Sequence, residues 1–552
     1  MFSKIFITHR ILVLGILGIL LLAATLRFWQ LGRIPEGFHA DEAAFGYNAY
    51  SILKTGKDEY AKPYPLILQS FNDYKGAIYA YLTIPFILIQ GLNEWSVRAP
   101  SAVFGVLFVL LTFALVYKIS TKLHLALLSM MLAGISPVGI MLSRVQSDPL
   151  VCVFFFYLGY YLWLLWFEKK NICYYFLSII SIIVSFYTYP STRLFVLPFL
   201  ILMGVLDWPG YSKKIRLSAV FAFLCVGIVV GAMSLTSARV RLTQISVFSK
   251  MDVQLPLDEK IREDGAMGMS VFATRVFHNK VTAYGQFLFD NFADYISYKF
   301  LFRQAGQPVR EAIPDSGVLL LIELPFFLIG IYSSFKNRFS YGIKAVLWFL
   351  LVPAILSIAR DETPNIHRFF LATIPLHMVV AIGIATLYKK FAAKYKIAFY
   401  VTVSSLFFVN VVFFLHQLFI HQPIHQPTYR NNTHNELANA LKKLYVSYDV
   451  VVSQKILEQM LFYWPVDPGT YQAEGSPRDL DNAWYRNFLF VTDACPSSRR
   501  NPVVQAIKNK RILYVDLPEC PMNKHKKIIK SIVYRNTLEA FRLVVRDDWG
   551  FE

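Results

Sequence analysis

The chain has 552 residues, of which 55% are hydrophobic and 16% are charged. With a mean hydropathy of +0.44, this composition excludes an ordinary soluble domain and predicts an α-helical polytopic membrane protein. The formal net charge of +19 does not indicate nucleic acid, because the basic residues stand in short clusters between apolar runs and form no stripe with stacking aromatic residues.

The first apolar run, residues 11–28, follows Lys4 and Arg10. It has no small-x-small cleavage motif and many further runs follow it, so we expect a retained membrane helix rather than a signal peptide. Runs long enough to cross about 30 Å of hydrocarbon predict about eleven membrane helices, at 11–28, 97–117, 123–142, 149–167, 172–188, 190–206, 217–235, 317–334, 341–359, 367–388 and 397–418.

The segment 76–90 is only 15 residues long, contains Pro85 and begins with tyrosines. The positions of lysine and arginine indicate whether it crosses. If it does not cross and the N-terminus is cytoplasmic, sixteen basic residues are cytoplasmic: Lys4, Arg10, Lys118, Lys122, Lys169, Lys170, Lys213, Lys214, Arg216, Lys336, Arg338, Lys344, Lys389, Lys390, Lys394 and Lys396. A crossing would move fourteen of them outside, so we expect 76–90 to lie flat in the interface.

This topology places the large polar segments outside. They are a first loop at about 29–96, a second at about 236–316, and the C-terminal part. We therefore expect a transmembrane domain over 1–419 and an extracytoplasmic domain over 420–552, in the cell membrane of a bacterial or archaeal envelope. Contacts to anionic membrane lipids fit the basic clusters.

After residue 420, helical and strand patterns alternate, which predicts a small α/β accessory domain. A helix is expected at 436–445 and strands at 449–453 and within "NFLFVTDACP", "RILYVDLPECP" and "FRLVVRD", with helices between the strands. No glycine-rich phosphate motif follows these strands, so a nucleotide site is not expected. Cys495 and Cys520 each follow a strand-like run and can pair if the domain faces an oxidising compartment.

Two adjacent carboxylates, Asp41 and Glu42, stand in the first external loop. They can be solvated acids, or Asp41 can cap the helix-like segment that follows; neither alternative excludes chemistry. Lys75 in the same loop is either a snorkelling interfacial lysine or an ammonium placed to bind a lipid phosphate.

Further polar residues stand at the external ends of later runs. Arg144 and Asp148 are four residues apart and can form a local ion pair, while Arg193 lies one turn inside a span, where arginine needs a partner or a watery cavity. The complete set at these junctions comprises Arg144, Asp148, Tyr187, Tyr189, Arg193, Arg303, Arg310, Arg360, Asp361, Glu362, His367 and Arg368. Each can be solvated, but together they surround the outer side with carboxylates and cations.

A metal is possible, because His39 stands beside Asp41 and histidines recur at 416, 421, 425 and 434. No pair has a ligand spacing such as H-E-x-x-H, so no metal or other cofactor is expected. An outward-facing membrane enzyme with acids, a lysine and arginines at headgroup depth suits a lipid-phosphate substrate. One carboxylate would accept the proton of an acceptor hydroxyl, and cations would stabilise the departing phosphate.

The order of motifs over about 10–400 resembles the GT-C type integral-membrane glycosyltransferases, and among them the protein O-mannosyltransferase and aminoarabinose transferase group (glycosyltransferase family 39-like). The resemblance rests on "HADEAAFGYNAY", "YKGAIYAYL", "GLNEWSVRAPSAVFG", "GISPVGIMLSRVQSDPL", "YTYPSTRLFVLP" and "HRFFLATIP". It implies a GT-C fold with a flat juxtamembrane helix in the first loop.

The resemblance also implies roles for individual residues. Asp41 matches the acid regarded as the catalytic base, with Glu42 beside it, and Lys75 matches a lysine proposed to hold the donor phosphate. That lysine is usually followed by two prolines, whereas Gly76 and Ala77 stand here. The substrate-binding candidates are Lys75, Arg144, Asp148, Tyr189, Arg193, Arg303, Arg310, His367 and Arg368, the last followed by phenylalanine where the family usually has tyrosine.

The implied reaction is transfer of a sugar, with inversion, from a polyprenyl-phosphate-linked donor to an acceptor protein, lipid or glycan on the external face. The enzyme would be a hexosyl- or mannosyltransferase, although the sequence specifies neither sugar nor acceptor. The main alternative is a membrane transporter or flippase of a lipid-linked substrate, for which Glu323 within an apolar run is the best midplane candidate. A non-catalytic sensor would not require acids at several junctions.

Overall fold

The computed structural model describes residues 2–70, 73–207, 227–228, 253–359, 362–425, 427–454 and 456–547. Most of the predicted run 217–235, the cluster Lys213, Lys214 and Arg216, and the pair Arg360 and Asp361 lie outside these residues. The chain divides into two compact units: the first comprises residues 1–27, 101–143 and 147–417, and the second comprises 28–100, 144–146 and 418–552.

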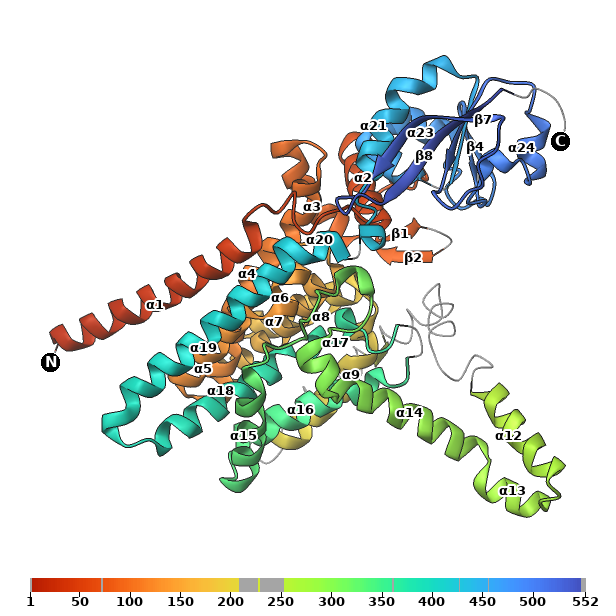
Figure 1. The fold of residues 1–552 in the computed structure, drawn as a ribbon. Helices are drawn as coiled ribbons and strands as arrows, with labels where there is room; N and C mark the ends of the chain where they lie inside the picture. Colours follow the sequence, from red (N-terminus) through yellow and green to blue (C-terminus); the bar gives the residue numbers. More distant parts are fainter. Residues whose placement is uncertain are drawn as a thin grey trace. The chain divides into compact units, whose positions relative to one another are not determined.

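The first unit is a bundle of helices (Figure 1). Its longer helices are α1 (Phe2–Phe28), α4 (Glu94–Ser120), α5 (Leu123–Ile135), α7 (Asp148–Lys169), α8 (Ile172–Thr188), α9 (Ser191–Asp207), α12 (Gln254–Ala266), α14 (Lys280–Ile296), α15 (Glu323–Lys336), α16 (Ser340–Leu356), α18 (Thr373–Lys390) and α19 (Lys396–His416). Its shorter ones are α6 (Pro137–Ser143), α13 (Val271–Phe277), η3 (Lys299–Arg303), η4 (Val309–Glu311), α17 (Ile366–Phe369), η5 (Phe370–Ala372) and η6 (Ala393–Tyr395).

Five helical stretches of the described residues are long and apolar enough to cross a membrane: Arg10–Phe28, Glu94–Ser120, Asp148–Lys169, Ile366–Lys390 and Ala393–His425. A sixth is formed if α5 and α6, which meet at a bend of 56°, are counted as one span. The chain is thus an integral membrane protein, but the expected eleven helices are not confirmed. Several predicted runs are covered by shorter helices: α8 and α16 have 17 residues each, and α15 has 14.

Helix α18 lies deep in the first unit, because 89% of the apolar window is buried in the stretch Ile366–Lys390, which contains it. It packs closely against α15, where both helices carry glycine. A Cβ atom on Gly383 would lie 1.9 Å from the Phe326 carbonyl oxygen, and one on Gly330 would lie 2.0 Å from the Val379 carbonyl oxygen. Small residues allow this close backbone approach, as in other membrane helix pairs.

The second unit combines the first loop with the C-terminal part. The loop contributes α2 (Ala40–Thr55), β1 (Ile67–Ser70), β2 (Asp73–Gly76) and α3 (Ile78–Gln90). The C-terminal helices are η7 (Gln417–His421), α20 (Gln422–His425), η8 (Pro427–Arg430), α21 (His434–Leu444), η9 (Tyr445–Ser447), α22 (Leu457–Tyr463), α23 (Pro468–Glu474), η10 (Pro496–Ser498) and α24 (Pro502–Ala506). With 13 residues, α3 is too short to cross about 30 Å of hydrocarbon.

A six-stranded sheet lies in the C-terminal part, with strand order β4-β5-β3-β6-β8-β7. The strands are β3 (Val450–Gln454), β4 (Ala483–Tyr485), β5 (Phe488–Val491), β6 (Ile512–Asp516), β7 (Lys526–Val533) and β8 (Glu539–Arg546). The central strand β3 pairs in parallel with β5 and β6, and the outer pairs are antiparallel. Strands β3, β5, β6 and β8 lie where the sequence predicts strands.

The helix expected before "FRLVVRD" is wrong, because β7 occupies this position as an edge strand paired with β8. Its isoleucines and lysines are spaced so that a helix and a strand are both possible. Pairing with β8 decides between them, since tertiary contacts override local preference.

The first loop packs directly on the helices of the C-terminal part. Phe38 lies against Phe462 with ring centroids 4.4 Å apart, and the buried Tyr47 belongs to the same apolar core as the sheet. The sequence placed a domain boundary only at 419/420, whereas the compact second unit includes residues 28–100. This grouping follows from α2, whose residues 42–49 are all buried and which packs against α3, α22 and α23.

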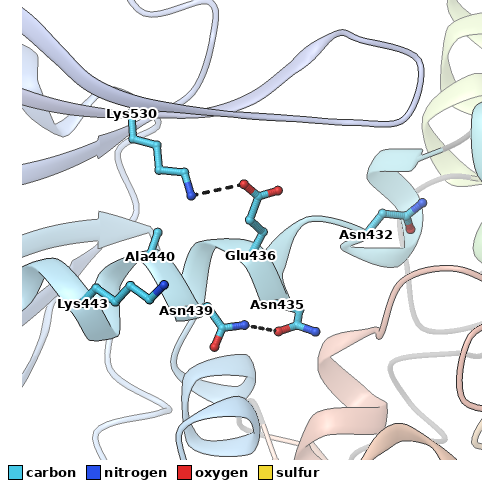
Figure 2. A pocket seen from close by; sticks show the side chains of 7 residues that line it. All are labelled: Asn432, Asn435, Glu436, Asn439, Ala440, Lys443 and Lys530. Atoms are coloured by element: carbon cyan, nitrogen blue, oxygen red, sulfur yellow. Dashed lines mark hydrogen bonds and ion pairs between the residues drawn. The ribbon is translucent and has the colours of Figure 1, made fainter.

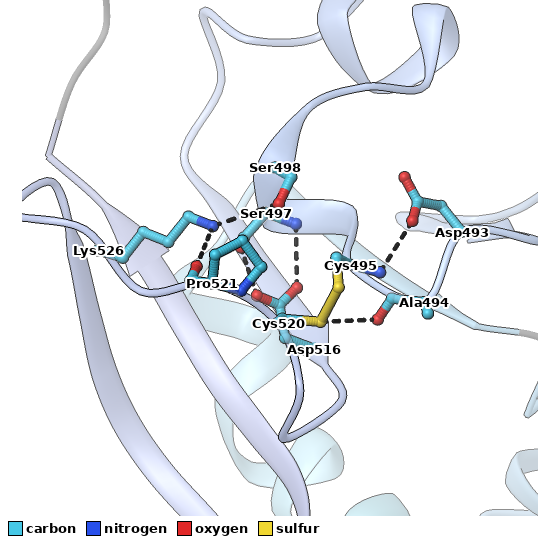
Figure 3. The surroundings of a disulfide bond; sticks show 9 residues. All are labelled: Asp493, Ala494, Cys495, Ser497, Ser498, Asp516, Cys520, Pro521 and Lys526. Carbon is cyan, nitrogen blue, oxygen red and sulfur yellow. Dashed lines mark hydrogen bonds between the residues drawn. A yellow bond between two sulfur atoms is a disulfide. The ribbon is translucent and has the colours of Figure 1, made fainter.

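Cys495 and Cys520 form a disulfide bond beside the sheet (Figure 3). The neighbouring Asp516 is buried and accepts hydrogen bonds from the Ser497 backbone N–H, at 3.0 Å, and from its hydroxyl group. Lys526 donates to the Pro521 carbonyl oxygen at 2.8 Å. The disulfide joins the loop after β5 to the loop after β6. A disulfide bond fits a domain that faces an oxidising compartment.

Candidate active site

Helix α2 begins at Ala40, directly before the two acids of the first loop, and His39 is its N-cap. His39 Nδ1 accepts the Asp41 backbone N–H at 3.2 Å, and the Glu42 carboxylate accepts the His39 N–H at 3.1 Å. This reciprocal arrangement is a capping box. The expectation that Asp41 caps the helix is therefore wrong, and its carboxylate is available for other contacts.

Asp41 forms an ion pair with Lys75, which strand β2 supplies. Both side chains are partly buried, with 28% of Asp41 and 16% of Lys75 exposed. Burial opposes ionisation of Asp41, but the positive charge of Lys75 and the contact with His39 outweigh it and hold the pKa of this carboxyl well below its usual value. Asp41 is therefore an ionised carboxylate that keeps some access to solvent.

Glu42 has a different environment, because its carboxylate is buried and saturated with donors. It accepts hydrogen bonds from Arg98 Nε at 3.0 Å, Arg430 Nη2 at 2.6 Å and the Gln146 backbone N–H at 3.1 Å, besides His39. Burial alone would raise its pKa, but the two guanidiniums lower the pKa to about 2. A carboxylate offers about four lone pairs, so Glu42 has no free acceptor for a substrate proton.

The two arginines Arg98 and Arg144 fix the segment that leads into α2. Arg98 donates to the carbonyl oxygens of Leu31 at 3.2 Å, Pro35 at 3.0 Å and Gly37. Arg144 donates to those of Trp29 at 2.6 Å and Ile34 at 3.0 Å. Five carbonyl groups of the segment 29–37 are thus held in place by two buried guanidiniums.

Gly37 is required at the end of this segment. Its φ is +86°, and a Cβ atom there would lie 2.4 Å from the Arg430 carbonyl oxygen and 2.1 Å from Asn432 Oδ1. An L side chain would be strained in this conformation and would also collide with the backbone. The loop entering α2 can therefore follow this path only with glycine.

A second buried cluster, Glu59, Arg478 and Glu458, joins the first loop to the C-terminal part. Arg478 Nη1 lies 2.6 Å from Glu59 Oε1, and Arg478 Nε lies 3.4 Å from Glu458 Oε1. Asn48 Nδ2 also donates to Glu59 Oε1 at 2.9 Å. Burial raises the pKa of Glu59 to about 7, although Arg478 acts in the opposite direction.

This raised pKa predicts a stability that depends on pH. Since folding favours the protonated form of Glu59, the stabilisation is complete below the unfolded pKa, about 4.5, and is lost as the pH rises through about 7. We expect the free energy of unfolding to fall by on the order of 2 kcal/mol between pH 5 and pH 8, as thermal unfolding in detergent would measure. Glu59→Gln, which cannot ionise, should remove this slope.

The control for Glu59→Gln is Glu474→Gln, which affects a half-exposed ion pair with Arg486. This control should leave the pH dependence of the wild type unchanged, because exposed pairs contribute little. Equal slopes in the wild type and in Glu59→Gln would rule out Glu59 as the titrating group.

A polar groove of about 460 Å³ lies beside α21 (Figure 2). It is lined by Asn432, Asn435, Glu436, Asn439, Ala440, Lys443 and Lys530. Lys530 Nζ lies 3.3 Å from Glu436 Oε1, and Asn439 Nδ2 donates to Asn435 Oδ1 at 2.6 Å. Because its polar groups partly satisfy one another's hydrogen-bonding capacity, we assign this groove no catalytic role.

In the first unit, the turn between α8 and α9 holds Tyr189 and Arg193. Tyr189 is the C-cap residue of α8, and Arg193 donates to the Phe186 carbonyl oxygen from Nε at 3.1 Å and from Nη2 at 2.7 Å. A cation at the C-terminus of a helix is favourable for the helix dipole. This contact satisfies the need of Arg193 for a partner inside an apolar run. Asp148 lies in the first turn of α7, which Ser147 caps.

Arg310 and His367 come together through Glu311, a residue that no sequence motif indicated. Glu311 is 5% exposed, and its Oε2 lies 3.2 Å from Arg310 Nε and 3.8 Å from His367 Nε2. By contrast, Arg303 pairs with Asp315 at 3.0 Å on the surface, where both are about half exposed. Arg303 and Arg310 thus have different surroundings despite their closeness in sequence.

The position of Arg368 depends on Asn365, whose side-chain oxygen accepts the Arg368 backbone N–H at 3.0 Å. The Asn365 N–H in turn donates to the Tyr295 hydroxyl oxygen at 3.1 Å. Burial raises the pKa of Tyr295 to about 12, while Arg368 lowers it and Tyr189 raises it. Tyr295 therefore stands close to both junctions in the first unit, and nothing in its sequence context indicated this.

The structure thus brings Asp41, Glu42, Lys75 and Arg144 into the second unit, and the remaining candidates belong to the first. Arg98 stands inside the quoted motif "GLNEWSVRAP", so the sequence offered a signal for it, whereas Arg430 had none. Among the described residues, no group of three or more His, Cys, Asp and Glu side chains is placed to hold a metal ion.

Comparison with known proteins gives two kinds of match. Residues 75–236, less than half of the chain, match the family described as dolichyl-phosphate-mannose-protein mannosyltransferase. Among solved structures, ArnT from Cupriavidus metallidurans bound to undecaprenyl phosphate is similar with a TM-score of 0.52 and 12% sequence identity, over 98% of this chain and 99% of that one. The chain has the GT-C fold. No curated protein matches its sequence.

The GT-C fold and the family match over 75–236 confirm the resemblance to GT-C type membrane glycosyltransferases. The archaeal oligosaccharyltransferase AglB from Archaeoglobus fulgidus, in complex with an inhibitory peptide and a dolichol-phosphate, also matches, with a TM-score of 0.49 and 11% identity. That match covers 84% of this chain and 64% of AglB.

Proposed function

We propose that this protein is an inverting glycosyltransferase that moves a sugar from a polyprenyl-phosphate-linked donor to an acceptor hydroxyl group, with Asp41 as the general base. The observation that carries the proposal is the ion pair of Asp41 with Lys75. It combines a partly exposed, ionised carboxylate with an ammonium suited to a phosphate. The ArnT structure with the same fold is bound to undecaprenyl phosphate, which supports this class of donor.

In the proposed reaction, Asp41 accepts the proton of the acceptor hydroxyl, and the oxygen atom of that hydroxyl attacks the anomeric carbon of the sugar. The bond between that carbon and the phosphate oxygen breaks, and its electron pair leaves with the polyprenyl phosphate. One base and no covalent intermediate are sufficient for inversion, as in the analogous inverting hydrolases.

Lys75 would have two roles in this reaction, one toward Asp41 and one toward the donor phosphate. Without substrate it keeps Asp41 ionised; with the donor bound, the phosphate competes for the same ammonium. Sharing Lys75 weakens its hold on Asp41 and raises the pKa of that carboxyl toward a value better suited to a base.

Glu42 is then a positioning residue, because its carboxylate holds Arg98, Arg430 and the start of α2. In the first unit, we propose that Arg368, Arg193 and Tyr189 contact the donor. The other candidates with this role are Arg144, Asp148, Arg303, Arg310 and His367. The distribution of lysine and arginine supports an active site on the extracytoplasmic face.

The test uses the purified full chain in proteoliposomes with labelled polyprenyl-phosphate sugars and a membrane extract as the source of acceptors. We expect labelled acceptor and free polyprenyl phosphate from at least one lipid donor, and no transfer from nucleotide sugars. Movement of the lipid donor across the bilayer without a covalent product would support a flippase instead. Transfer from a nucleotide sugar alone would contradict the proposed donor class.

A further inference from the structure

An apolar cavity of about 970 Å³ lies among helices α1, α5, α18 and α19 of the first unit. Each helix contributes apolar side chains, such as Leu22, Leu128, Ala385 and Phe407 in chain order. Ligand cavities in proteins usually measure about 300 to 1,000 Å³, so this one is large. Its lining suits hydrocarbon rather than a small polar molecule.

The basic groups of the cavity concentrate at one end. His124, at the start of α5, and Lys389, in the last turn of α18, both line it, together with Tyr388. Lys396 Nζ lies 5.0 Å from the centroid of the Tyr388 ring. One end of an otherwise apolar cavity is thus basic, which matches a ligand with hydrocarbon chains and an anionic headgroup.

This basic end is far from the junction assigned to the donor. Arg368 and Lys389 stand near opposite ends of the 25-residue stretch Ile366–Lys390. At about 1.5 Å per residue, a helix separates them by roughly 30 Å, about the thickness of the hydrocarbon layer. A phosphate at Lys389 would therefore lie in the opposite leaflet from a phosphate at Arg368.

Two of the four helices around the cavity have little protein packing. Only 11% of the apolar window is buried in each of the stretches that contain α1 and α19. The corresponding share is 89% in the stretch that contains α18. An apolar cavity between weakly and strongly packed helices loses dispersion contacts when it is empty. A bound lipid would restore these contacts on both sides.

We propose that this cavity binds one anionic glycerophospholipid of the cytoplasmic leaflet. Its acyl chains lie between the pair α1 and α19 and the pair α5 and α18, and its headgroup phosphate contacts His124, Lys389 and Lys396. The lipid is a structural ligand that holds the two outer helices to the bundle. The site is separate from the one that binds the sugar donor.

The test measures lipid binding to the delipidated full chain by native mass spectrometry, with phosphatidylglycerol and phosphatidylcholine of equal chain length. We expect phosphatidylglycerol to bind more tightly and to raise the melting temperature. The double variant Lys389→Gln/Lys396→Gln should weaken phosphatidylglycerol binding at least about tenfold, since each lysine adds to the attraction, and should change phosphatidylcholine binding little.

The matched control, Lys390→Gln/Lys394→Gln, removes the same number of charges. Neither residue lines the cavity, and Lys394 lies over the Tyr395 ring, whereas Lys396 lies over the cavity residue Tyr388. The control should retain phosphatidylglycerol binding within about twofold, because exposed charges outside the site are screened. An equal loss in the control pair would overturn the proposal and indicate only a general attraction to a basic surface.

A second variant, Ala385→Trp, fills the cavity without altering charge and should weaken both lipids about tenfold or more, because the acyl chains lose their space. If this variant does not fold, Leu128→Phe provides the same test with a smaller added volume. Unchanged retention of both lipids by a folded cavity-filling variant would contradict the proposed site and assign the lipid to the protein's outer surface.

Discussion

Asp41→Asn is expected to lower the rate of sugar transfer by about 10²- to 10⁴-fold, the usual contribution of a general base. Asparagine has a similar shape and keeps the backbone N–H that His39 accepts, so the start of α2 should be preserved. The measurement is the initial rate of transfer at saturating lipid donor, together with the melting temperature of the variant.

The matched control for Asp41→Asn is Glu36→Gln. Glu36 stands five residues before Asp41 and pairs with Arg535 at 2.8 Å, outside the proposed machinery. The Glu36→Gln variant should transfer sugar at close to the wild-type rate. Full activity of a folded Asp41→Asn protein would remove Asp41 from the mechanism.

The electrostatic part of this prediction is tested by Lys75→Met. Loss of the ammonium removes the main interaction that lowers the pKa of Asp41, so this pKa should rise. The acidic limb of the pH profile of kcat/KM should then move to higher pH, since this profile reports the base of the free enzyme, which must be ionised to act. An unchanged profile with a raised KM would mean that Lys75 only binds the donor.

Arg98→Met is expected to destabilise the second unit by about 3 to 5 kcal/mol, because it leaves a buried carboxylate with fewer partners. Arg98 is 1% exposed and holds both Glu42 and the carbonyl groups of the loop before α2. Thermal or chemical unfolding in detergent measures the loss, and transfer should fall with it because Asp41 loses its position.

The control for Arg98→Met is Arg535→Met, which breaks an ion pair whose arginine is 62% exposed. It should cost less than about 1 kcal/mol. The double variant Glu42→Gln/Arg98→Met should recover part of the loss, since it removes the unpaired charge. No recovery would mean that packing of the arginine matters more than its charge.

The pKa of Glu42 adds a pH dependence to the same measurement. Because folding lowers this pKa from 4.5 to about 2, the stabilisation is complete above the unfolded value and is lost as the pH falls toward 2. The difference in the free energy of unfolding between the wild type and Glu42→Gln should therefore disappear in acid.

Much of the site could be predicted from local patterns, but its pairing could not. The sequence identified Asp41, Glu42 and Lys75 as members of one loop. It could not separate the two acids, because their difference depends on which guanidiniums each one meets. Arg430 reaches Glu42 across 388 residues, and no local rule connects them.

The fold was predictable to a similar extent. Apolar runs indicated a membrane protein, since hydrophobic length is a direct physical requirement for crossing a bilayer. The number of membrane helices stays a prediction, because a run such as 123–142 can bend within its length, as α5 and α6 do at Ser136. The edge strand β7 was missed because a partner strand, rather than its own residues, determines its conformation.

The bond between Glu42 and Arg430 has a consequence for the biosynthesis of the protein. At about 5 to 20 residues per second, a ribosome needs on the order of 20 to 80 s to proceed from the first of these residues to the second, since 388 residues separate them. During this interval the first loop has been made but lacks one of the arginines that hold it in place. The nascent protein should therefore stay inactive until the segment that contains Arg430 has been synthesised and has folded.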